Sequence, residues 1–332
     1  RHTVTRKTRI CIPGPGRVEL QPFTDDMPLP DDHIEGPALA SAISPGTELS
    51  CAYSNQDPAR PPSGTGYSMV FRVQNAGSAS GFMPGEVVFC MAGHQSWVRC
   101  PSAHVYRVPQ GMDPADAALA RLAGVSWSTL TTTSARPPAR VAVTGLGIVG
   151  NLAAQIFAAS GYRVLACDPV AGRRQHLASL GFDVCERLPI EDSEWAGHTA
   201  LVVECSGHEA ATLDACRLVA KGGEVVLVGV PWRKRTDLSA FDVVHAVFHK
   251  YVHLRSGWEW EVPKEPTEFR AGSIRDNITG AMTWFASGRL SAQGIARQVD
   301  PRDCDGVYRE LREQSNDALT AIFDWTRLEN EQ

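Results

Sequence analysis

The residues best suited to chemistry form a glycine-rich segment, Val141-Ala-Val-Thr-Gly145-Leu-Gly147-Ile-Val-Gly150. It follows a β-branched run and precedes apolar residues at helical spacing. Asp168 ends the next such run, eighteen residues after Gly150. This order predicts a strand, a tight turn and a helix that bind a dinucleotide. Gly145 would permit the turn, Gly147 would let the backbone approach a pyrophosphate, and Gly150 would let the helix pack close to the strand.

The start of that helix and the end of the next strand should contact opposite parts of the dinucleotide. The phosphates would meet the positive end of the helix dipole and its first backbone N–H groups. These groups belong to Ile148, Val149 and Gly150. The Asp168 carboxylate can accept two hydrogen bonds from the adenosine ribose, and its charge would repel a 2′-phosphate, so we expect NAD. Arg173 could bind that phosphate, which leaves NADP open.

Two later apolar runs end in small residues that could border the nicotinamide. The first run is followed by Ser206 and Gly207, and the second by Gly229 and Val230. The carboxyl ends of parallel strands line the ligand crevice in such sheets. Each glycine could also be an ordinary turn at the end of a strand.

Alternating strands and helices around this segment predict an α/β fold with a doubly wound parallel sheet of the Rossmann type. The expected strands cover residues 140–144, 163–167, 182–185, 201–204 and 224–230, and the expected helices cover 151–160, 173–180 and 209–219. Residues 11–112 are rich in Pro and Gly with short apolar runs, which is typical of an irregular antiparallel β-domain. Further on, we expect a helix over Ser273–Ser287, capped by Ser273, and a strand over Thr320–Asp324.

Composition narrows the classes of function. The 332 residues are 43% hydrophobic and 21% charged, which suits a globular protein of about two domains. A net charge of -5 lacks the positive field that nucleic acid or an anionic membrane would require. Nine cysteines without a CxxC pair predict buried free thiols in a reducing compartment. No stretch approaches eighteen apolar residues, so we expect no signal peptide, no transmembrane helix and a cytoplasmic location.

The order of a β-rich part, a Rossmann part and a C-terminal return resembles the medium-chain dehydrogenase/reductase superfamily, which is alcohol dehydrogenase-like. Four motifs carry the resemblance: Ser44-Pro-Gly46-Thr47-Glu48, Gly66-Tyr67-Ser68-Met-Val-Phe71-Arg-Val73, Pro84-Gly85-Glu86-Val-Val-Phe89 and Ala286-Ser-Gly288-Arg289-Leu290. The resemblance implies a GroES-like catalytic domain over residues 1–122 and 272–332, and a Rossmann domain over 123–271. It also implies a homodimer or tetramer joined through the Rossmann domains.

The zinc ligands of that superfamily are missing from the corresponding positions. The resemblance places Ser44 and Pro45, then Tyr67 and Ser68, and then Arg121 where zinc-dependent members have Cys, His or Glu ligands. Tetrahedral zinc needs thiolate, imidazole or carboxylate donors, and an arginine would repel the ion. We therefore expect no zinc. The motifs are most similar to zinc-less branches, which include dehydrogenases of bacteriochlorophyll synthesis and of sugars and cyclitols.

Without zinc, side chains must stabilise an alkoxide and move its proton. Tyr67 stands at the former zinc-histidine position and could hydrogen-bond the substrate oxygen. Thr47 matches the superfamily's Ser/Thr proton relay, and Ser44 is a nearby hydroxyl. His94 falls on a segment that borders the substrate pocket in the superfamily, and its ordinary pKa of ~6.5 suits a general acid or base. Each residue could instead have a structural role, Tyr67 and His94 as hydrogen-bonded packing residues.

Two further groups of residues could serve a site. His245, His249 and His253 have helical i, i+4, i+8 spacing, but the helix should end near Tyr251, so the third His would not align with the others. Trp258 and Trp260 could line a substrate pocket or a dimer contact, and the sequence does not separate these alternatives.

Three functions fit these observations. The first is a zinc-independent NAD-linked dehydrogenase that interconverts a secondary alcohol and a ketone on a polyol, cyclitol, sugar or natural-product scaffold of secondary metabolism. The second is an enoyl- or quinone-type double-bond reductase, which needs only a hydride and an oxyanion donor. The third is a non-catalytic cofactor-binding protein. In each case the partner is a small molecule, not nucleic acid or a membrane.

Overall fold

The computed structural model describes residues 7–54 and 63–328. The chain forms two compact units, unit 1 from residues 1–121 and 292–332 and unit 2 from residues 122–291. The first boundary falls inside α2 (Pro114–Thr132), and the chain returns to unit 1 at Ala292. Helix α7 (Ile274–Ala286) belongs to unit 2 and packs on the second half of α2, where the rings of Trp127 and Trp284 lie 4.4 Å apart.

Unit 2 is built on a six-stranded parallel sheet with the strand order β12-β11-β10-β13-β14-β15. Its strands are β10 (Arg140–Thr144), β11 (Arg163–Cys167), β12 (Asp183–Cys185), β13 (Thr199–Glu204), β14 (Val219–Leu227) and β15 (His253–Ser256). Its helices besides α2 and α7 are α3 (Ile148–Ala159), α4 (Ala171–Ser179), α5 (Glu209–Leu218) and α6 (Ala240–Lys250). This is the doubly wound sheet that the sequence predicted.

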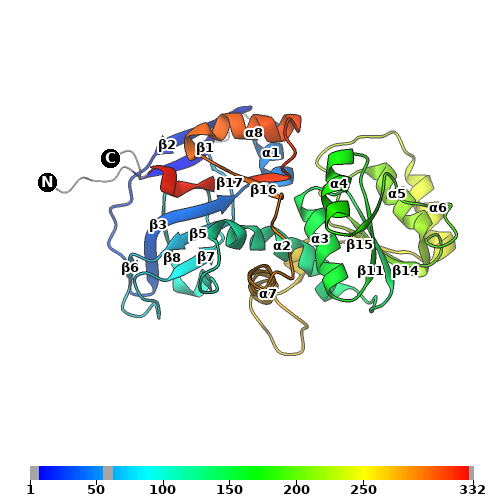
Figure 1. The fold of residues 1–332 in the computed structure, drawn as a ribbon, viewed down its shortest axis with the longest axis horizontal. Helices are drawn as coiled ribbons and strands as arrows, with labels where there is room; N and C mark the ends of the chain where they lie inside the picture. Colours follow the sequence, from blue (N-terminus) through cyan, green and yellow to red (C-terminus); the bar gives the residue numbers. More distant parts are fainter. Residues whose placement is uncertain (1–6, 55–62, 329–332) are drawn as a thin grey trace. The chain divides into compact units, whose positions relative to one another are not determined.

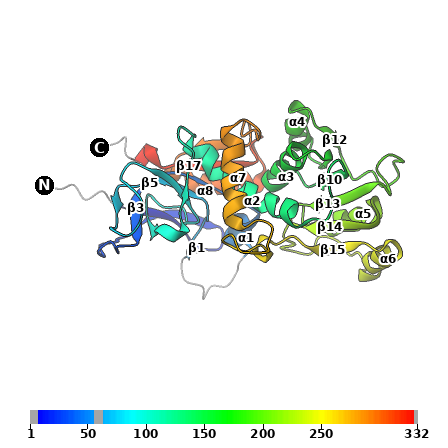
Figure 2. The ribbon, with the colours of Figure 1, turned by 90° about the horizontal axis from the view of Figure 1, so that it is seen from below.

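Successive residues of the central strands enter two different cores, so both faces of the sheet are covered. Val141 and Val143 of β10 pack with α3 and α4, whereas Ala142 packs on the other face with α5 and α6. Figures 1 and 2 show these four helices flanking the sheet. Burial on both faces explains why the strands read as continuous apolar runs rather than as alternating ones.

Two local expectations for unit 2 have different outcomes. Ser273 is the N-cap of α7 and its side chain accepts a hydrogen bond from the Asp276 N–H, as the capping pattern predicted. The strand expected over residues 224–230 instead runs from Val219 to Leu227, so Lys221–Gly223 lie inside β14. The register between β13 and β14 shifts there, so the extra residues form an irregularity within the strand.

Unit 1 is β-rich and mostly antiparallel, as expected. A three-stranded sheet has the order β2-β1-β4, and a larger sheet follows β16-β17-β3-β5-β7-β9 with β6 and β8 also paired to β3. The strands are β1 (Thr8–Gly14), β2 (Arg17–Pro22), β3 (His33–Ala42), β4 (Ser63–Gly64), β5 (Met69–Arg72), β6 (Asn75–Ala76), β7 (Val87–Cys90), β8 (Trp97–Pro101), β9 (Tyr106–Arg107), β16 (Ala296–Val299) and β17 (Thr320–Asp324). The helices are α1 (Pro45–Tyr53) and α8 (Cys304–Glu313).

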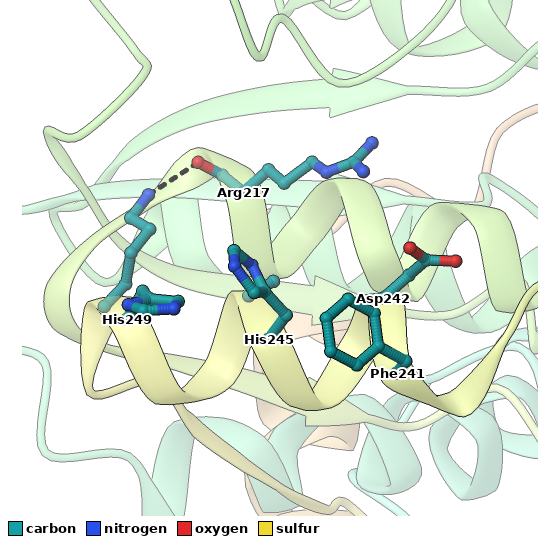
Figure 3. A pocket seen from close by; sticks show the side chains of 7 residues that line it. Arg217, Phe241, Asp242, His245 and His249 are labelled. Atoms are coloured by element: carbon teal, nitrogen blue, oxygen red, sulfur yellow. Dashed lines mark hydrogen bonds between the residues drawn. The ribbon is translucent and has the colours of Figure 1, made fainter.

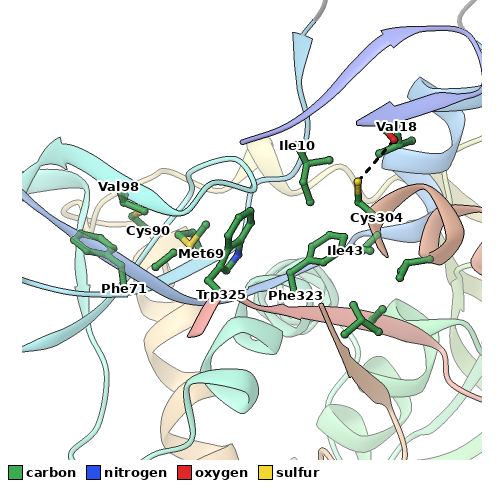
Figure 4. Packing of buried hydrophobic residues seen from close by; sticks show 14 of the residues in the cluster. Ile10, Val18, Ile43, Met69, Phe71, Cys90, Val98, Cys304, Phe323 and Trp325 are labelled. Atoms are coloured by element: carbon green, nitrogen blue, oxygen red, sulfur yellow. Dashed lines mark hydrogen bonds between the residues drawn. The ribbon is translucent and has the colours of Figure 1, made fainter. Parts of the chain in front are cut away.

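The core of unit 1 joins residues from both ends of its sequence. Met69 and Phe71 of β5 pack in one cluster with Phe323 of β17 and with Trp325, and Figure 4 shows these side chains together. Burial of each large apolar side chain contributes about 1.5–3 kcal/mol, so the C-terminal segment is a major stabilising part of the unit. Across residues 7–54 and 63–328, no helix combines the length and the apolar character that crossing a membrane requires.

Candidate functional site

The glycine turn of unit 2 is a close backbone contact between a strand end and a helix start. Gly145 has a φ of +84°, which L side chains rarely adopt. A Cβ placed on Gly150 would lie 1.7 Å from the Gly145 carbonyl oxygen, so this position accepts only glycine. Gly147 differs from both, because a Cβ there would meet nothing within 4 Å. The open space beside Gly147 is the space that a pyrophosphate would need.

The N-terminus of α3 fits an anionic group. Gly147 is its N-cap and offers no side-chain cap. The first N–H groups of a helix have no partner within the helix, and they carry its positive partial charge. These are the N–H groups of Ile148, Val149 and Gly150, which the sequence assigned to the phosphates. The local structure is therefore compatible with the predicted dinucleotide.

Asp168 lies at the carboxyl end of β11 and is only 2% exposed. Its two carboxylate oxygens accept hydrogen bonds of 2.7 Å from the backbone N–H groups of Leu146 and Val170. These bonds hold the carboxylate beside the glycine turn, and each oxygen keeps a further lone pair. The Arg173 guanidinium lies 3.5 Å from the same carboxylate. The positive charge of Arg173 is therefore partly neutralised by the Asp168 carboxylate.

The loops after β13 and β14 interlock at the same edge of the sheet. A Cβ on Gly207 would lie 2.5 Å from the Val230 carbonyl oxygen, and one on Gly229 would lie 2.4 Å from the Gly207 nitrogen. A Cβ on Gly145 would in turn lie 2.6 Å from the Ser206 nitrogen. The structure therefore brings the predicted cofactor residues of three strand ends together. Glycine is required at positions 145, 207 and 229 because the backbones of these loops touch one another, whether or not a cofactor is bound.

Sequence reasoning missed the carboxylate that holds one of these loops. Glu204, the last residue of β13, is buried and accepts hydrogen bonds from the Ser206 N–H at 2.7 Å and from the Gly207 N–H at 3.1 Å. Burial raises its pKa above the ordinary value. The sequence shows only that Glu204 stands between an apolar run and Cys-Ser-Gly. That pattern is equally typical of an exposed glutamate at the end of a strand.

Three of the hydroxyl residues expected at the catalytic position lie together in unit 1. The Tyr67 hydroxyl donates a hydrogen bond to Ser44 Oγ, and Thr47 also hydrogen-bonds the phenol. Ser44 is the N-cap of α1, and Thr47 is in its first turn, so one helix start positions both. Tyr67 and Thr47 are half-buried. We refer to Ser44, Thr47 and Tyr67 as the hydroxyl cluster.

Arg121 completes the surroundings of Tyr67. Its guanidinium carbon lies 4.9 Å from the centre of the Tyr67 ring, and the side chain is 3% exposed. A cation over an aromatic face is an attractive contact, strengthened where water is excluded. Burial raises the pKa of the Tyr67 phenol, while its hydrogen bonds with Ser44 and Thr47 and the charge of Arg121 act in the opposite direction. The phenol therefore stays protonated at neutral pH and can donate its hydrogen.

His94 lies in the interior rather than on a loop that meets the substrate. It is 1% exposed, its Nδ1 is 2.7 Å from Ser41 Oγ and its Nε2 is 2.9 Å from Glu48 Oε2. Both ring nitrogens are thus engaged within unit 1. This arrangement matches the structural alternative for His94 and offers a substrate no free nitrogen.

Glu48 is the centre of this buried network, and the sequence quoted it only as part of a motif. The carboxylate accepts hydrogen bonds from the Ser44 N–H at 2.8 Å and from Thr65 Oγ1 at 3.1 Å, and also from the Tyr308 hydroxyl. Burial alone would raise the pKa of Glu48, but the electrostatic interaction with His94 and the hydrogen bonds from His94, Tyr308 and the Ser44 N–H lower it below its ordinary value. Glu48 therefore links the hydroxyl cluster at Ser44 to the core of unit 1.

The histidines of α6 form a separate surface feature. His245 and His249 stack with ring centres 4.2 Å apart and line a pocket of about 430 Å³ with Arg217, Phe241, Asp242, Ala246 and Lys250 (Figure 3). His253 is on β15, beyond the left-handed Tyr251 that ends the helix, as predicted. No group of three or more His, Cys, Asp or Glu side chains suited to a metal occurs among residues 7–54 and 63–328.

Comparison with known proteins finds sequence similarity to dehydrogenases. Residues 149–263 match the sequence family described as "Zinc-binding dehydrogenase". A stretch of 146 residues is 30% identical to an alcohol dehydrogenase of Geobacillus stearothermophilus, covering 42% of this chain and 43% of that protein. The aligned part thus spans less than half the length of that curated relative. The family match lies in unit 2 and includes none of the positions where the superfamily binds zinc.

Solved structures agree over nearly the whole chain. Galactitol-1-phosphate dehydrogenase from Escherichia coli superposes with a TM-score of 0.78 at 14% identity, covering 96% of this chain and 99% of that one. L-idonate 5-dehydrogenase from Escherichia coli superposes with a TM-score of 0.79 at 15% identity, covering 96% and 98%. The sequence matches and the shared fold support the resemblance to the medium-chain dehydrogenase/reductase superfamily.

We expect Glu48→Gln to lose about 3 kcal/mol of unfolding free energy at neutral pH, because it removes one partner of a buried charge network. A carboxylate whose pKa is lowered by folding stabilises the protein above its ordinary pKa and loses that contribution as the pH falls through the lowered value. The difference between wild type and variant should therefore shrink on acidification. Urea unfolding from pH 7 to pH 3 measures it. Glu313→Gln, an exposed site in α8, is the control, and a pH-independent difference would contradict the argument.

Proposed function

We propose that the chain is a zinc-independent, NAD-linked dehydrogenase that interconverts a secondary alcohol and a ketone. The observation that carries this proposal is the pairing of Arg121 with Tyr67 at positions where zinc-dependent relatives hold their metal. A buried guanidinium supplies positive charge, and the phenol beside it supplies a proton, so both tasks of the ion have a candidate residue. The residues at these positions, which are Ser44, Tyr67, Ser68 and Arg121, lack the thiolate, imidazole and carboxylate groups that bind tetrahedral zinc, and this supports the zinc-independent proposal.

The dinucleotide, when bound, supplies or accepts the hydride. The chain's part is to bind it through the N-terminus of α3 and the Asp168 carboxylate, and to handle the substrate's oxygen. In the reduction direction, the Tyr67 hydroxyl turns from Ser44 to the carbonyl oxygen and donates its proton there. The resulting phenolate lies beside the Arg121 guanidinium and regains a proton through the hydroxyls of Ser44 and Thr47. Oxidation follows the reverse order. In this scheme His94 orients Glu48 and does not contact the substrate.

The substrate class is inferred from the relatives. Those with partial sequence similarity include an alcohol dehydrogenase and an L-galactonate-5-dehydrogenase, and the fold is shared with dehydrogenases of galactitol-1-phosphate and L-idonate. Several of these relatives are named for substrates with hydroxylated carbon chains. We therefore propose that the substrate of this chain is a polyol, cyclitol, sugar or related natural product. Free thiols at all nine cysteines are compatible with the reducing cytoplasm that we propose as the location.

Replacing Tyr67 by Phe should lower kcat/KM by about 100-fold, because it removes the proposed proton donor while keeping the ring on Arg121. NAD⁺ reduction with a panel of secondary alcohols provides the assay. Tyr106→Phe, in β9 against Phe89, is the matched control and should keep the wild-type rate. An unchanged rate in Tyr67→Phe would remove the phenol from the mechanism, and stoichiometric zinc in the active protein would refute the metal-free proposal.

The same assay separates the alternatives. NADPH oxidation with enones, without turnover of ketones, would replace the proposal by a double-bond reductase. Cofactor binding without turnover of either panel would indicate a non-catalytic binding protein.

Asp168→Ser should reduce the preference for NAD over NADP by about tenfold or more, because it removes both a ribose acceptor and the charge that repels a 2′-phosphate. Calorimetric Kd values for NAD⁺ and NADP⁺ give this ratio. Asp183→Ser, at the exposed start of β12, is the control. A ratio that does not change would show that Asp168 does not face the ribose.

We infer that unit 2 mediates self-association. Phe241, Val244 and Phe248 share one face of α6 and are more than 60% exposed, with Phe248 at 76%. Exposed apolar patches of this kind mark interaction sites, and a second copy is the occupant that the superfamily resemblance implies. Light scattering should give a multiple of the single-chain mass for the wild type. For Phe248→Glu we expect a lower average mass, because fewer chains associate. Met27→Glu, at an exposed apolar site of unit 1, should behave as wild type. A monomeric wild type would contradict the inference.

A further inference from the structure

Two cysteines meet at the base of the proposed ribose site. Cys167 ends β11 and Cys185 ends β12, and the two residues are direct partners in the parallel pairing of these strands. Their sulfur atoms are 2.9 Å apart. Neighbouring strands are about 4.8 Å apart, which lies within the Cα separations that disulfides span. The pair is therefore close enough to form a covalent bond between the two strand ends.

The two thiols differ in a way that suits stepwise oxidation. Cys167 is fully buried, whereas Cys185 is partly exposed and can meet a small solute. The hydrogen bond from Cys167 lowers the pKa of the Cys185 thiol, and the Arg174 guanidinium acts in the same direction. The same hydrogen bond and burial raise the pKa of Cys167 well above its ordinary value. Cys185 is thus the more nucleophilic sulfur, and Cys167 is the thiol placed to react with its oxidised form.

The pair is connected to the cofactor residue through the backbone. Asp168 follows Cys167 directly, and its N–H donates a hydrogen bond of 3.2 Å to the Cys185 carbonyl oxygen. The two sulfur atoms must approach from 2.9 Å to about 2.05 Å when the S–S bond forms. Forming the bond must therefore draw the two strand ends together. The carboxylate of Asp168, held at 2.7 Å from the N–H groups of Leu146 and Val170, would move with them.

We propose that Cys167 and Cys185 form a peroxide-sensitive thiol pair whose disulfide weakens dinucleotide binding at Asp168. In the first step the Cys185 thiolate attacks hydrogen peroxide, the O–O bond breaks, and Cys185 sulfenic acid and hydroxide form, the latter taking a proton to give water. In the second step the Cys167 sulfur attacks that sulfenic acid, the S–O bond breaks, and a second water leaves with the Cys167 proton. Peroxide is reduced by two electrons and the two thiols are oxidised by two.

The effect on binding rests on the proposed function, but the modification does not. The disulfide would be partly exposed through Cys185, and exposed disulfides are readily reduced by thiols. The change is therefore reversible, and reduced chain regains its affinity. Cys90 and Cys100 also interact with each other, but they belong to unit 1. They are not part of the β11–β12 pairing next to Asp168, so they provide a control pair.

Peptide mapping after hydrogen peroxide treatment tests the modification on the full chain. We expect a Cys167–Cys185 linked peptide that disappears on treatment with dithiothreitol. Calorimetry with NAD⁺ tests the consequence, and we expect the Kd to rise by about tenfold on oxidation and to return on reduction. Cys185→Ala and Cys167→Ala should bind NAD⁺ with the same Kd before and after peroxide. Cys100→Ala should respond as wild type does.

The outcomes separate the two proposals. Alkylation of both thiols after peroxide treatment, or a mapped disulfide with an unchanged Kd, would overturn the inference while the cofactor site stands. Reduced wild type that binds neither NAD⁺ nor NADP⁺ would overturn the proposed function and the effect on binding, and the peptide map would still decide whether the thiol pair is modified.

Discussion

One buried negative charge organises unit 1. Glu48 is 2% exposed and is hydrogen-bonded by the start of α1, by Thr65, by His94 and by Tyr308 of α8. A carboxylate removed from water is tolerated only when its oxygens are satisfied, so these segments must come together for the unit to fold. The same carboxylate holds the Ser44 backbone, and Ser44 accepts the hydrogen bond of Tyr67. The position of the hydroxyl cluster thus depends on charge compensation in the interior.

Unit 2 depends on a different constraint, which is the approach of backbones without side chains between them. Gly145, Gly150, Gly207 and Gly229 each occupy a place where a Cβ would collide with a neighbouring backbone atom. Three strand ends are thereby packed at one edge of the sheet. Gly147 is the exception, because the space beside it is open. The edge is therefore rigid where loops touch each other and accessible where a ligand would bind.

Sequence patterns predicted unit 2 more fully than unit 1. The strands at 140–144 and 163–167 have the expected bounds, because β-branched runs between glycines are a local signal. Helix α7 and its Ser273 cap were predicted for the same reason. The inner irregularity of β14 was not, because Lys221-Gly-Gly has the composition of a turn and only its pairing with β13 shows otherwise.

The candidate site also has one part that the sequence predicted and one part that it did not. The glycine turn and Asp168 lie within one βαβ stretch, so their proximity follows from the chain itself. The partners of His94 and Glu48 come from Ser41, Thr65 and Tyr308, which are far apart in sequence, and no local pattern indicates that they meet. His94 therefore read as a candidate acid or base, and the structure gives it two internal partners. Arg121 was noted as a departure from the superfamily, but its contact with Tyr67 needed coordinates.

The discontinuity of unit 1 has a consequence for biosynthesis. Unit 2 is one continuous segment and can fold as soon as it has left the ribosome. Unit 1 cannot, because β3 lacks its neighbour β17 and Glu48 lacks Tyr308 until the last part of the chain has been translated. The unit 1 residues that precede Leu122 therefore lack these partners while the unit 2 segment is being made.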